Sequence, residues 1–471
     1  MKKYFLIITI LTLCHTLWAG PVDETTARKV AQNIYLMNMP TKAVCEMERV
    51  VLPADLSNLY IFNVKDGEGF VIVSGDDCAS PVLAYSTESS WVPELLPPAV
   101  NDWLEGYSHA IQWAQEHHLD SKAFQQEWAY ATAGFSTKDD ERVPPLVTTS
   151  WGQGKYYNTL CPPAPEHLSD DHVTAGCVAV AMAQLMKHWN YPTHGKGTYS
   201  YSWENHKYWN YGTLTADFEN TYYDWEHMPN SLSSSSTEEE VTAVATLMYH
   251  CGISVQMDYN CTNTGASDAC TMYAFLSDTN MCYTEFTYSA ENALYTFWGY
   301  KKSLHGLFKD DFTDSAWCAM LNNELRNNRP LIYRGEGSGG HCFVLDGLGA
   351  LGLYHFNWGW NGGANGYYSV SPLHAAGYNF DVRQSGIFGI EPDGTLGIND
   401  EPTKAAFTAF ARNGQLVVHS ERLGLITVYD MLGREVSRRM VSDYETVIPV
   451  STAGLYIVRM GGTACKVMVA Q

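Results

Sequence analysis

The segment 174–192 constrains the fold most strongly, because its apolar residues recur at the spacing of one helical face. The face consists of Val178, Ala181, Met182, Leu185 and Trp189. Lys187 and His188 follow near the expected carboxyl end, where the helix dipole favours positive charge, and Pro192 stops the helix. The segment therefore predicts a helix that begins close to Cys177.

Cys177 falls in the first turn of this predicted helix. Thr174 is the expected N-cap, and Gly176 allows the chain to turn tightly before the cysteine. Unpaired amide N–H groups and the helix dipole in a first turn lower the pKa of a thiol. Cys177 is thus a candidate nucleophile, and the plainer alternative is a buried cysteine that acts as a small apolar residue.

A second segment, 341–357, predicts a β-hairpin with a histidine at its start. Residues 341–346 and 352–357 are rich in β-forming residues, and a glycine-rich run at 347–352 joins them. A hairpin symmetric about Gly349 would place His341 opposite Asn357, with Cβ atoms about 4.5–5.5 Å apart. In that register the Asn357 amide could orient the imidazole.

Side chains alternate between the two faces of a strand, and this separates the other polar residues of the hairpin. Asp346 and Cys342 should point to the face opposite His341, which disfavours a metal site made from His341 and Cys342. His355 should share the face of Asn357, and we predict that it is a packed structural residue.

Three motifs in this order resemble the streptopain-like cysteine peptidases, a branch of the papain-like fold, and the resemblance covers about residues 151–390. The motifs are WGQGKYYN at 151–158, AGCVA at 175–179 with MKHWNYP at 186–192, and GH at 340–341 with FNWGWNG at 356–362. The resemblance implies an α+β catalytic domain with two papain-type subdomains. One carries the Cys177 helix, the other carries the His341 sheet, and the cleft lies between them.

The resemblance also implies a role for each matching residue. Cys177 would be the nucleophile and His341 the general base and acid. The Gln153 amide and the Cys177 backbone N–H would form the oxyanion hole, while Asn357 and Trp358 would position the imidazole. These residue types suit thioester chemistry, which needs a thiolate, a proton carrier and donors where negative charge develops.

Residues 1–20 carry two lysines, an apolar run and then small residues at the expected cleavage site, which is typical of a signal peptide.

Residues 21–142 predict an α+β unit with helices at 26–37 and 98–116 and strands at 59–64, 69–74 and 82–86. Segments 69–76 and 84–87 resemble a streptopain-type propeptide, which implies an intramolecular inhibitor; an ordinary accessory domain is the alternative. The polar run 137–145 predicts a cleavable linker, with the cut between residues 136 and 149.

The catalytic domain is expected at 143–393, followed by a linker at 394–402 and a small β-sandwich at 403–471. Its predicted strands are 415–419, 425–429, 446–450, 455–460 and 466–469. Residues 428–436 and 453–459 resemble the type A sorting domain of type IX secretion, which implies that the secretion machinery is a partner. A carbohydrate-binding or adhesive module is the alternative.

Charge and cysteine content exclude several other functions. A net charge of −22 is unsuited to nucleic acid or an anionic membrane surface. Of the twelve cysteines, one lies in the signal peptide, and the odd number that remains fits a catalytic thiol plus possible disulfides. The cysteines do not have the spacing of a zinc site, and we expect no metal or cofactor.

The sequence predicts a secreted or surface-located cysteine endopeptidase made as a zymogen, with protein and peptide substrates. The alternatives are a thioester-forming acyltransferase and a catalytically silent binding protein.

Overall fold

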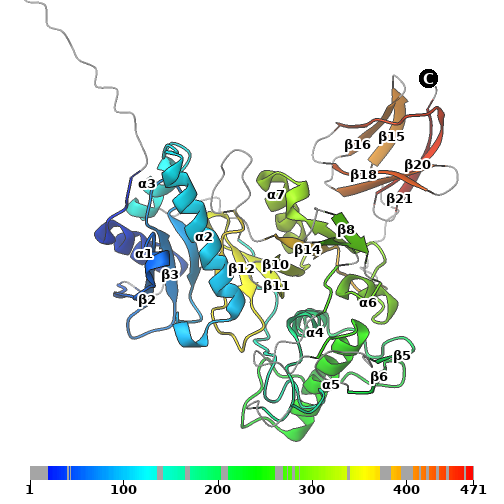
Figure 1. Cartoon of the computed structure of the whole chain (residues 1–471), viewed down its shortest axis with the longest axis horizontal. Coiled ribbons are helices and arrows are strands. Elements are labelled where there is room, and N and C mark those ends of the chain that lie inside the picture. The colour runs from blue at the N-terminus through cyan, green and yellow to red at the C-terminus, as the bar shows by residue number, and fades with distance from the viewer. Residues whose placement is uncertain are drawn as a thin grey trace, which may run out of the picture.

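The structure, a computed structural model, consists of an N-terminal unit, a central unit and a C-terminal sandwich (Figure 1). It describes residues 20–39, 42, 44–134, 142–164, 170–202, 211–259, 269–272, 274–277, 282–285, 287–336, 340–371, 383–393, 407–412, 415–420, 424–430, 434–441, 445–460 and 463–469. Residues 1–19 of the expected signal peptide, residues 137–141 of the first linker and the linker 394–402 lie outside the described residues.

The N-terminal unit contains the helices and strands that the sequence predicts, together with two that it does not predict. They are α1 (Glu24–Asn38), β1 (Met47–Arg49), β2 (Leu59–Val64), β3 (Phe70–Ser74), β4 (Val82–Ser86), α2 (Pro98–Glu116) and α3 (Gln125–Ala133). Asp23 caps α1 by accepting a hydrogen bond from the Thr26 backbone N–H. The short strand β1 and helix α3 were not predicted.

The central unit combines a helical part with a sheet. Its helices are α4 (Cys177–Trp189), α5 (Glu238–Ser254), α6 (Ala290–Thr296) and α7 (Asp314–Arg326). Its strands are β5 (Thr198–Ser202), β6 (Thr213–Asp217), β7 (Ala274–Ser277), β8 (Cys282–Glu285), β9 (His305–Phe308), β10 (Leu331–Glu336), β11 (Gly340–Leu348), β12 (Tyr354–Asn357), β13 (Gly366–Tyr368) and β14 (Ser385–Phe388). Helices α4 and α5 lie together on one side of the sheet (Figure 1).

One sheet of ten strands runs through both units. Its order is β1-β2-β3-β4-β13-β12-β11-β10-β14-β9. The junction is the antiparallel pair β4–β13, in which Tyr85 lies opposite Tyr367 and Ala84 opposite Tyr368. The N-terminal unit is therefore joined to the central unit by backbone hydrogen bonds across a sheet edge.

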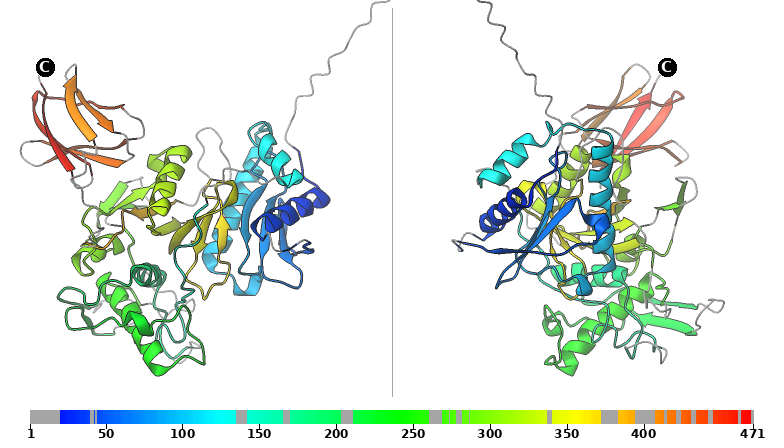
Figure 2. Two further views of the ribbon diagram at one scale, coloured as in Figure 1. Left: turned by 180° about the vertical axis from the view of Figure 1, so that it is seen from behind. Right: turned by 60° about the vertical axis from the view of Figure 1, so that its left-hand side comes forward.

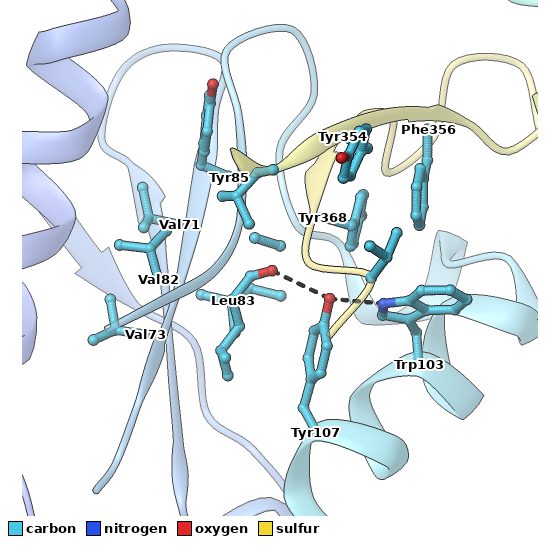
Figure 3. Packing of buried hydrophobic residues seen from close by; sticks show 14 of the residues in the cluster. Val71, Val73, Val82, Leu83, Tyr85, Trp103, Tyr107, Tyr354, Phe356 and Tyr368 are labelled. Atoms are coloured by element: carbon cyan, nitrogen blue, oxygen red, sulfur yellow. Dashed lines mark hydrogen bonds between the residues drawn. The ribbon is translucent and has the colours of Figure 1, made fainter. Parts of the chain in front are cut away.

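Two large hydrophobic cores cover the two faces of this sheet. One lies under α4 and α5, and the other packs α1 and α2 of the N-terminal unit against residues of β11, β12 and β13. Figure 3 shows Trp103 and Tyr107 of α2 pointing into the second core, toward Phe356 and Tyr368. The Tyr107 hydroxyl donates toward the Leu83 carbonyl at 3.2 Å and accepts from Trp103 Nε1 at 2.7 Å.

The C-terminal strands form two sheets that face each other. One contains β15 (Phe407–Arg412), β16 (Gln415–Ser420) and β19 (Glu445–Ile448); the other contains β18 (Glu435–Val441), β17 (Gly424–Tyr429), β20 (Gly454–Met460) and β21 (Thr463–Val469). The predicted small sandwich is confirmed, with two further strands, β15 and β18. The sandwich lies toward the end of the molecule opposite to α1 (Figures 1 and 2).

We expect Trp103→Ala to lower the free energy of unfolding of the precursor by about 3–5 kcal/mol, because it empties a large buried site between the two units. Trp103 is only 4% exposed and lies edge-on to Phe356, Phe343 and Trp358. Urea unfolding of the Cys177→Ala precursor would measure the change. Val44→Ala is the control because Val44 is 83% exposed. Equal stability of the two variants would show that α2 contributes little to the shared core.

Candidate active site

Cys177 is the first residue of α4, as the sequence predicts, but the cap differs. The N-cap is Gly176, with φ 91° and ψ 141°, so the prediction of Thr174 as the cap is wrong. A positive φ is easily adopted only by glycine, and it lets the chain turn into the helix immediately before the cysteine. The half-buried Cys177 thiol therefore lies in the first turn, where the dipole and the amide N–H groups favour a thiolate.

Gln184 is a buried polar residue of α4 that the sequence reading missed. Its Oε1 accepts hydrogen bonds from the Trp151 backbone N–H and the Thr149 hydroxyl, both at 3.1 Å. Its Nε2 donates to Asn357 Oδ1 at 3.2 Å. Gln184 thus joins the helix of Cys177 to the segment before Gln153 and to β12. In the sequence, its buried role is indicated by a single amide side chain among apolar positions of the helix.

Gln153 lies beside the segment that leads to Cys177. Its backbone carbonyl accepts a hydrogen bond from the Ala175 N–H at 2.9 Å. The neighbouring Gly152 packs so closely against Asn361 that a Cβ on Gly152 would lie 2.4 Å from the Asn361 Oδ1. A larger residue at position 152 would require the Asn361 side chain to move, and the first and third motifs meet at this point.

The hairpin register differs from the predicted one. Val344, and not His341, pairs with Asn357, and Leu345 pairs with Phe356. This shift of three residues is odd, so His341 and Asn357 project to opposite faces of the sheet. Two local features cause the shift: the ladder is irregular between Leu345 and Gly347, and the loop includes Leu351 with φ 57°.

Asn357 is fully engaged in holding the central unit together. Its Nδ2 donates to the Thr149 carbonyl at 2.6 Å, and its Oδ1 accepts from Gln184 Nε2 and from the Gly359 N–H at 3.2 Å. The residue is 1% exposed. In this structure Asn357 orients the α4 side of the sheet, so the predicted contact with the imidazole is absent.

The ring of His341 is held by Trp358 in the way the motifs suggest, although through the backbone. His341 Nε2 lies 3.0 Å from the Trp358 carbonyl oxygen. A carbonyl only accepts hydrogen bonds, so Nε2 carries the proton and Nδ1 is the nitrogen that can receive one. The ring also stacks on Phe343 and Trp358, at 6.2 and 6.1 Å between centroids.

The surroundings of His341 keep its imidazole neutral. Burial lowers the pKa of His341 to about 4, although the Trp358 carbonyl and the charge of Asp102 act in the opposite direction. Asp102 belongs to α2 of the N-terminal unit. The electrostatic environment of the histidine therefore includes the segment that the sequence identifies as a propeptide.

The two candidate catalytic residues lie on different sides of β11. Helix α4 packs on the face that carries Cys342 and Val344, and Cys342 is buried there as predicted. The ring of His341 packs on the other face, with Phe343 and Trp358, whose rings also contact Trp103 of α2. The ring of His341 and the Trp103 side chain of α2 therefore lie on one side of β11, and α4 packs on the other side.

Comparison with known proteins identifies both units. Residues 151–368 match the Peptidase C10 family, and residues 19–111 match the Spi protease inhibitor family. The chain is 30% identical over 368 residues to streptopain of Streptococcus pyogenes, covering 74% of this chain and 84% of streptopain. It is also 30% identical over 435 residues to the thiol protease/hemagglutinin PrtT of Porphyromonas gingivalis, covering 86% of this chain and 46% of that protein, so it spans less than half of that relative.

A solved structure of a prointerpain A fragment from Prevotella intermedia has the same fold. It aligns with a TM-score of 0.58 and 28% identity, and the alignment covers 74% of this chain and all of that fragment. The predicted α+β fold with a propeptide before a papain-like protease is therefore confirmed.

We expect Asn357→Ala to destabilise the protein by about 1–3 kcal/mol, because the Thr149 carbonyl and the Gln184 amide would lose a buried partner. Urea unfolding in the Cys177→Ala background would measure this change in the free energy of unfolding. Asn220→Ala is the matched control, since the Asn220 side chain is exposed and donates to the Asp217 carboxylate at the surface. If Asn357→Ala left stability unchanged but reduced turnover of the mature enzyme, orientation of the imidazole would be its main role.

Proposed function

The chain belongs to the Peptidase C10 family, and on that premise we propose that it hydrolyses peptide bonds in proteins with Cys177 as nucleophile and is made as an inactive zymogen. The observation that carries the proposal is the placement of Cys177 at the first position of α4, with Gln153 alongside and the base His341 on the adjoining strand β11.

In the proposed mechanism, His341 Nδ1 takes the proton of the Cys177 thiol, and the thiolate attacks the carbonyl carbon of the substrate. The Gln153 amide and the Cys177 backbone N–H stabilise the oxyanion. His341 then gives its proton to the leaving amine, and a thioester remains. Water, deprotonated by His341, attacks the thioester, the C–S bond breaks, and the thiol is restored.

The N-terminal unit supports the zymogen proposal by its position. Strand β4 extends the catalytic sheet at β13, and Trp103 packs against Trp358, the residue whose carbonyl holds His341. Removing this unit would expose the aromatic face on which the imidazole rests and leave the ring free to turn toward Cys177. We infer that residues 21–142 inhibit the enzyme until they are cut away.

Export rests on sequence features. We propose that residues 1–20 act as a signal peptide and that residues 403–471 direct the protein through type IX secretion to the cell surface or the medium. Within the part of the chain that the structure describes, no helix is long and apolar enough to span a membrane.

We expect Cys177→Ala to abolish hydrolysis of casein and to leave the precursor uncut, because no thioester can form without the thiol. Cys318→Ala in α7 is the matched control, since Cys318 is also half-buried. Iodoacetamide should inactivate the parent enzyme and the control alike. Casein hydrolysis by Cys177→Ala would remove this residue from its role.

The same assay separates the alternatives to hydrolysis. An acyltransferase would give amide products with an added amine in place of new carboxylates, and mass spectrometry distinguishes the two. A silent binding protein would turn over no substrate under reducing conditions.

We expect the activating cut to fall before Val143, in the N-terminal half of the window that the sequence predicts. Val143 exchanges two hydrogen bonds with Leu348, at 2.8 and 2.9 Å, and the Leu146 and Val147 N–H groups donate to Asp346. A protease binds its substrate as an exposed, extended segment. The hydrogen bonds of residues 143–147 hold this part of the chain against β11 and disfavour cleavage there.

Incubating the Cys177→Ala precursor with a trace of active enzyme and sequencing the new N-terminus would locate the cut. A new N-terminus between residues 144 and 150 would contradict the pairing argument. A precursor with Cys177 intact that is as active before cleavage as the trimmed form would show that residues 21–142 do not inhibit.

A further inference from the structure

His355 of β12 is buried between two carboxylates that come from different units. Its Nδ1 lies 2.6 Å from Asp346 Oδ1, and its Nε2 lies 2.6 Å from Glu88 Oε1. The side chain of His355 is 3% exposed, that of Asp346 is fully buried, and that of Glu88 is 50% exposed. The sequence reading treated His355 as a packed structural residue, and it did not connect it with the N-terminal unit.

Both ring nitrogens of His355 face acceptors, so the ring is an imidazolium that donates to each carboxylate. Burial alone would lower the pKa of His355, but the charge of Asp346 and the hydrogen bonds to Asp346 and Glu88 outweigh it and raise the pKa to about 10. Burial also opposes ionisation of Glu88, yet the hydrogen bond from His355 holds the pKa of that carboxyl below its ordinary value. His355 and Glu88 are therefore both charged at neutral pH.

The pair His355–Asp346 belongs to the central unit alone. Asp346 Oδ2 accepts from the Val147 N–H at 2.8 Å, and its backbone carbonyl accepts from the Leu146 N–H, so Asp346 is fixed by the segment that stays after activation. The ring of Tyr367 stands edge-on to His355 at 5.1 Å. Of His355, Asp346 and Glu88, only Glu88 belongs to the N-terminal unit, so removal of that unit also removes Glu88.

Glu88 reaches His355 from the end of β4, next to the edge pairing with β13. The Glu88 N–H donates to the Ser86 hydroxyl, and that hydroxyl donates to the Asn365 carbonyl at 2.6 Å. The β4–β13 ladder itself contains only two paired positions. The contact of Glu88 with His355 lies three residues beyond Tyr85 and adds a charged interaction to this short ladder.

We propose that His355 and Asp346 form a carboxylate-binding subsite of the catalytic unit, outside the residues that carry the chemistry, and that this subsite recognises Glu88 of the prodomain. The ligand class is a carboxylate side chain that follows an extended strand paired with β13. The subsite selects the chain's own prodomain and fixes its register. The proposal rests on the zymogen function, because it needs the N-terminal unit to act as a releasable ligand.

The test uses the full precursor carrying Cys177→Ala, with a recognition sequence for an unrelated protease inserted between residues 136 and 142. Cutting there gives a non-covalent complex of the two pieces without any need for the chain's own activity. Dilution followed by analytical ultracentrifugation measures the dissociation constant. We expect Glu88→Gln to raise it about tenfold, because a hydrogen bond between charged groups is lost.

Three comparisons make the result specific. Glu94→Gln, which removes an exposed carboxylate from the same segment, should leave the dissociation constant unchanged. His355→Gln should weaken the complex at least as much as Glu88→Gln, and the double variant should be no weaker than His355→Gln alone. If His355→Gln does not fold, Glu88→Gln against Glu94→Gln still decides the question.

The effect of Glu88→Gln should also depend on pH. Because the pKa of Glu88 is lowered in the complex, its stabilisation is present above the ordinary carboxyl pKa and is lost as pH falls through the lowered value. Asp346 and Tyr367 also face His355, which stays protonated over this range. The ratio of the dissociation constant of the Glu88→Gln complex to that of the parent complex should therefore fall toward one below about pH 4.

The outcomes separate this subsite from the zymogen function. A parent complex that stays associated, with Glu88→Gln and Glu94→Gln equally tight, would overturn the subsite and leave the zymogen function standing. A parent complex that falls apart at once, together with a precursor with Cys177 intact that is as active before cleavage as the trimmed enzyme, would overturn the zymogen function and the subsite with it.

Discussion

The antiparallel pairing of β4 with β13 is the contact on which the rest of the precursor depends. It joins two units into one sheet, so that α2 packs over β11 and β12 and shares a core with them. Trp103 reaches Trp358 only because the sheet is continuous at this point. The ring of His341 in turn rests on Trp358. A backbone contact between two short strands thereby sets the position of the histidine.

A second set of contacts keeps the nucleophile in place independently of the prodomain. Gln184 and Asn357 hold α4 against β12 and the segment around Thr149, and none of these groups comes from residues 21–142. The contacts that position α4 thus do not involve the prodomain, whereas the ring of His341 rests on Trp358, which contacts Trp103 of the prodomain.

Hydrophobic periodicity predicted most of the elements, and it failed where the answer depends on contacts distant in sequence. Strands β2 and β4 and helix α2 have the predicted bounds, because their patterns are local. The hairpin register was wrong, because an irregular pairing near Asp346 and the left-handed Leu351 shift it by an odd number of residues. Gln184 and Glu88 were missed for the same reason, since their partners lie far away along the chain.

The shortness of β13 matters once the N-terminal unit has gone. Removal of β1 to β4 leaves β13 at the edge of the remaining sheet, where unpaired N–H and C=O groups can recruit a strand of another molecule. With three residues, this edge is too short to template a stable intermolecular ladder. The brevity of β13 therefore limits strand pairing between molecules once the N-terminal unit has been removed.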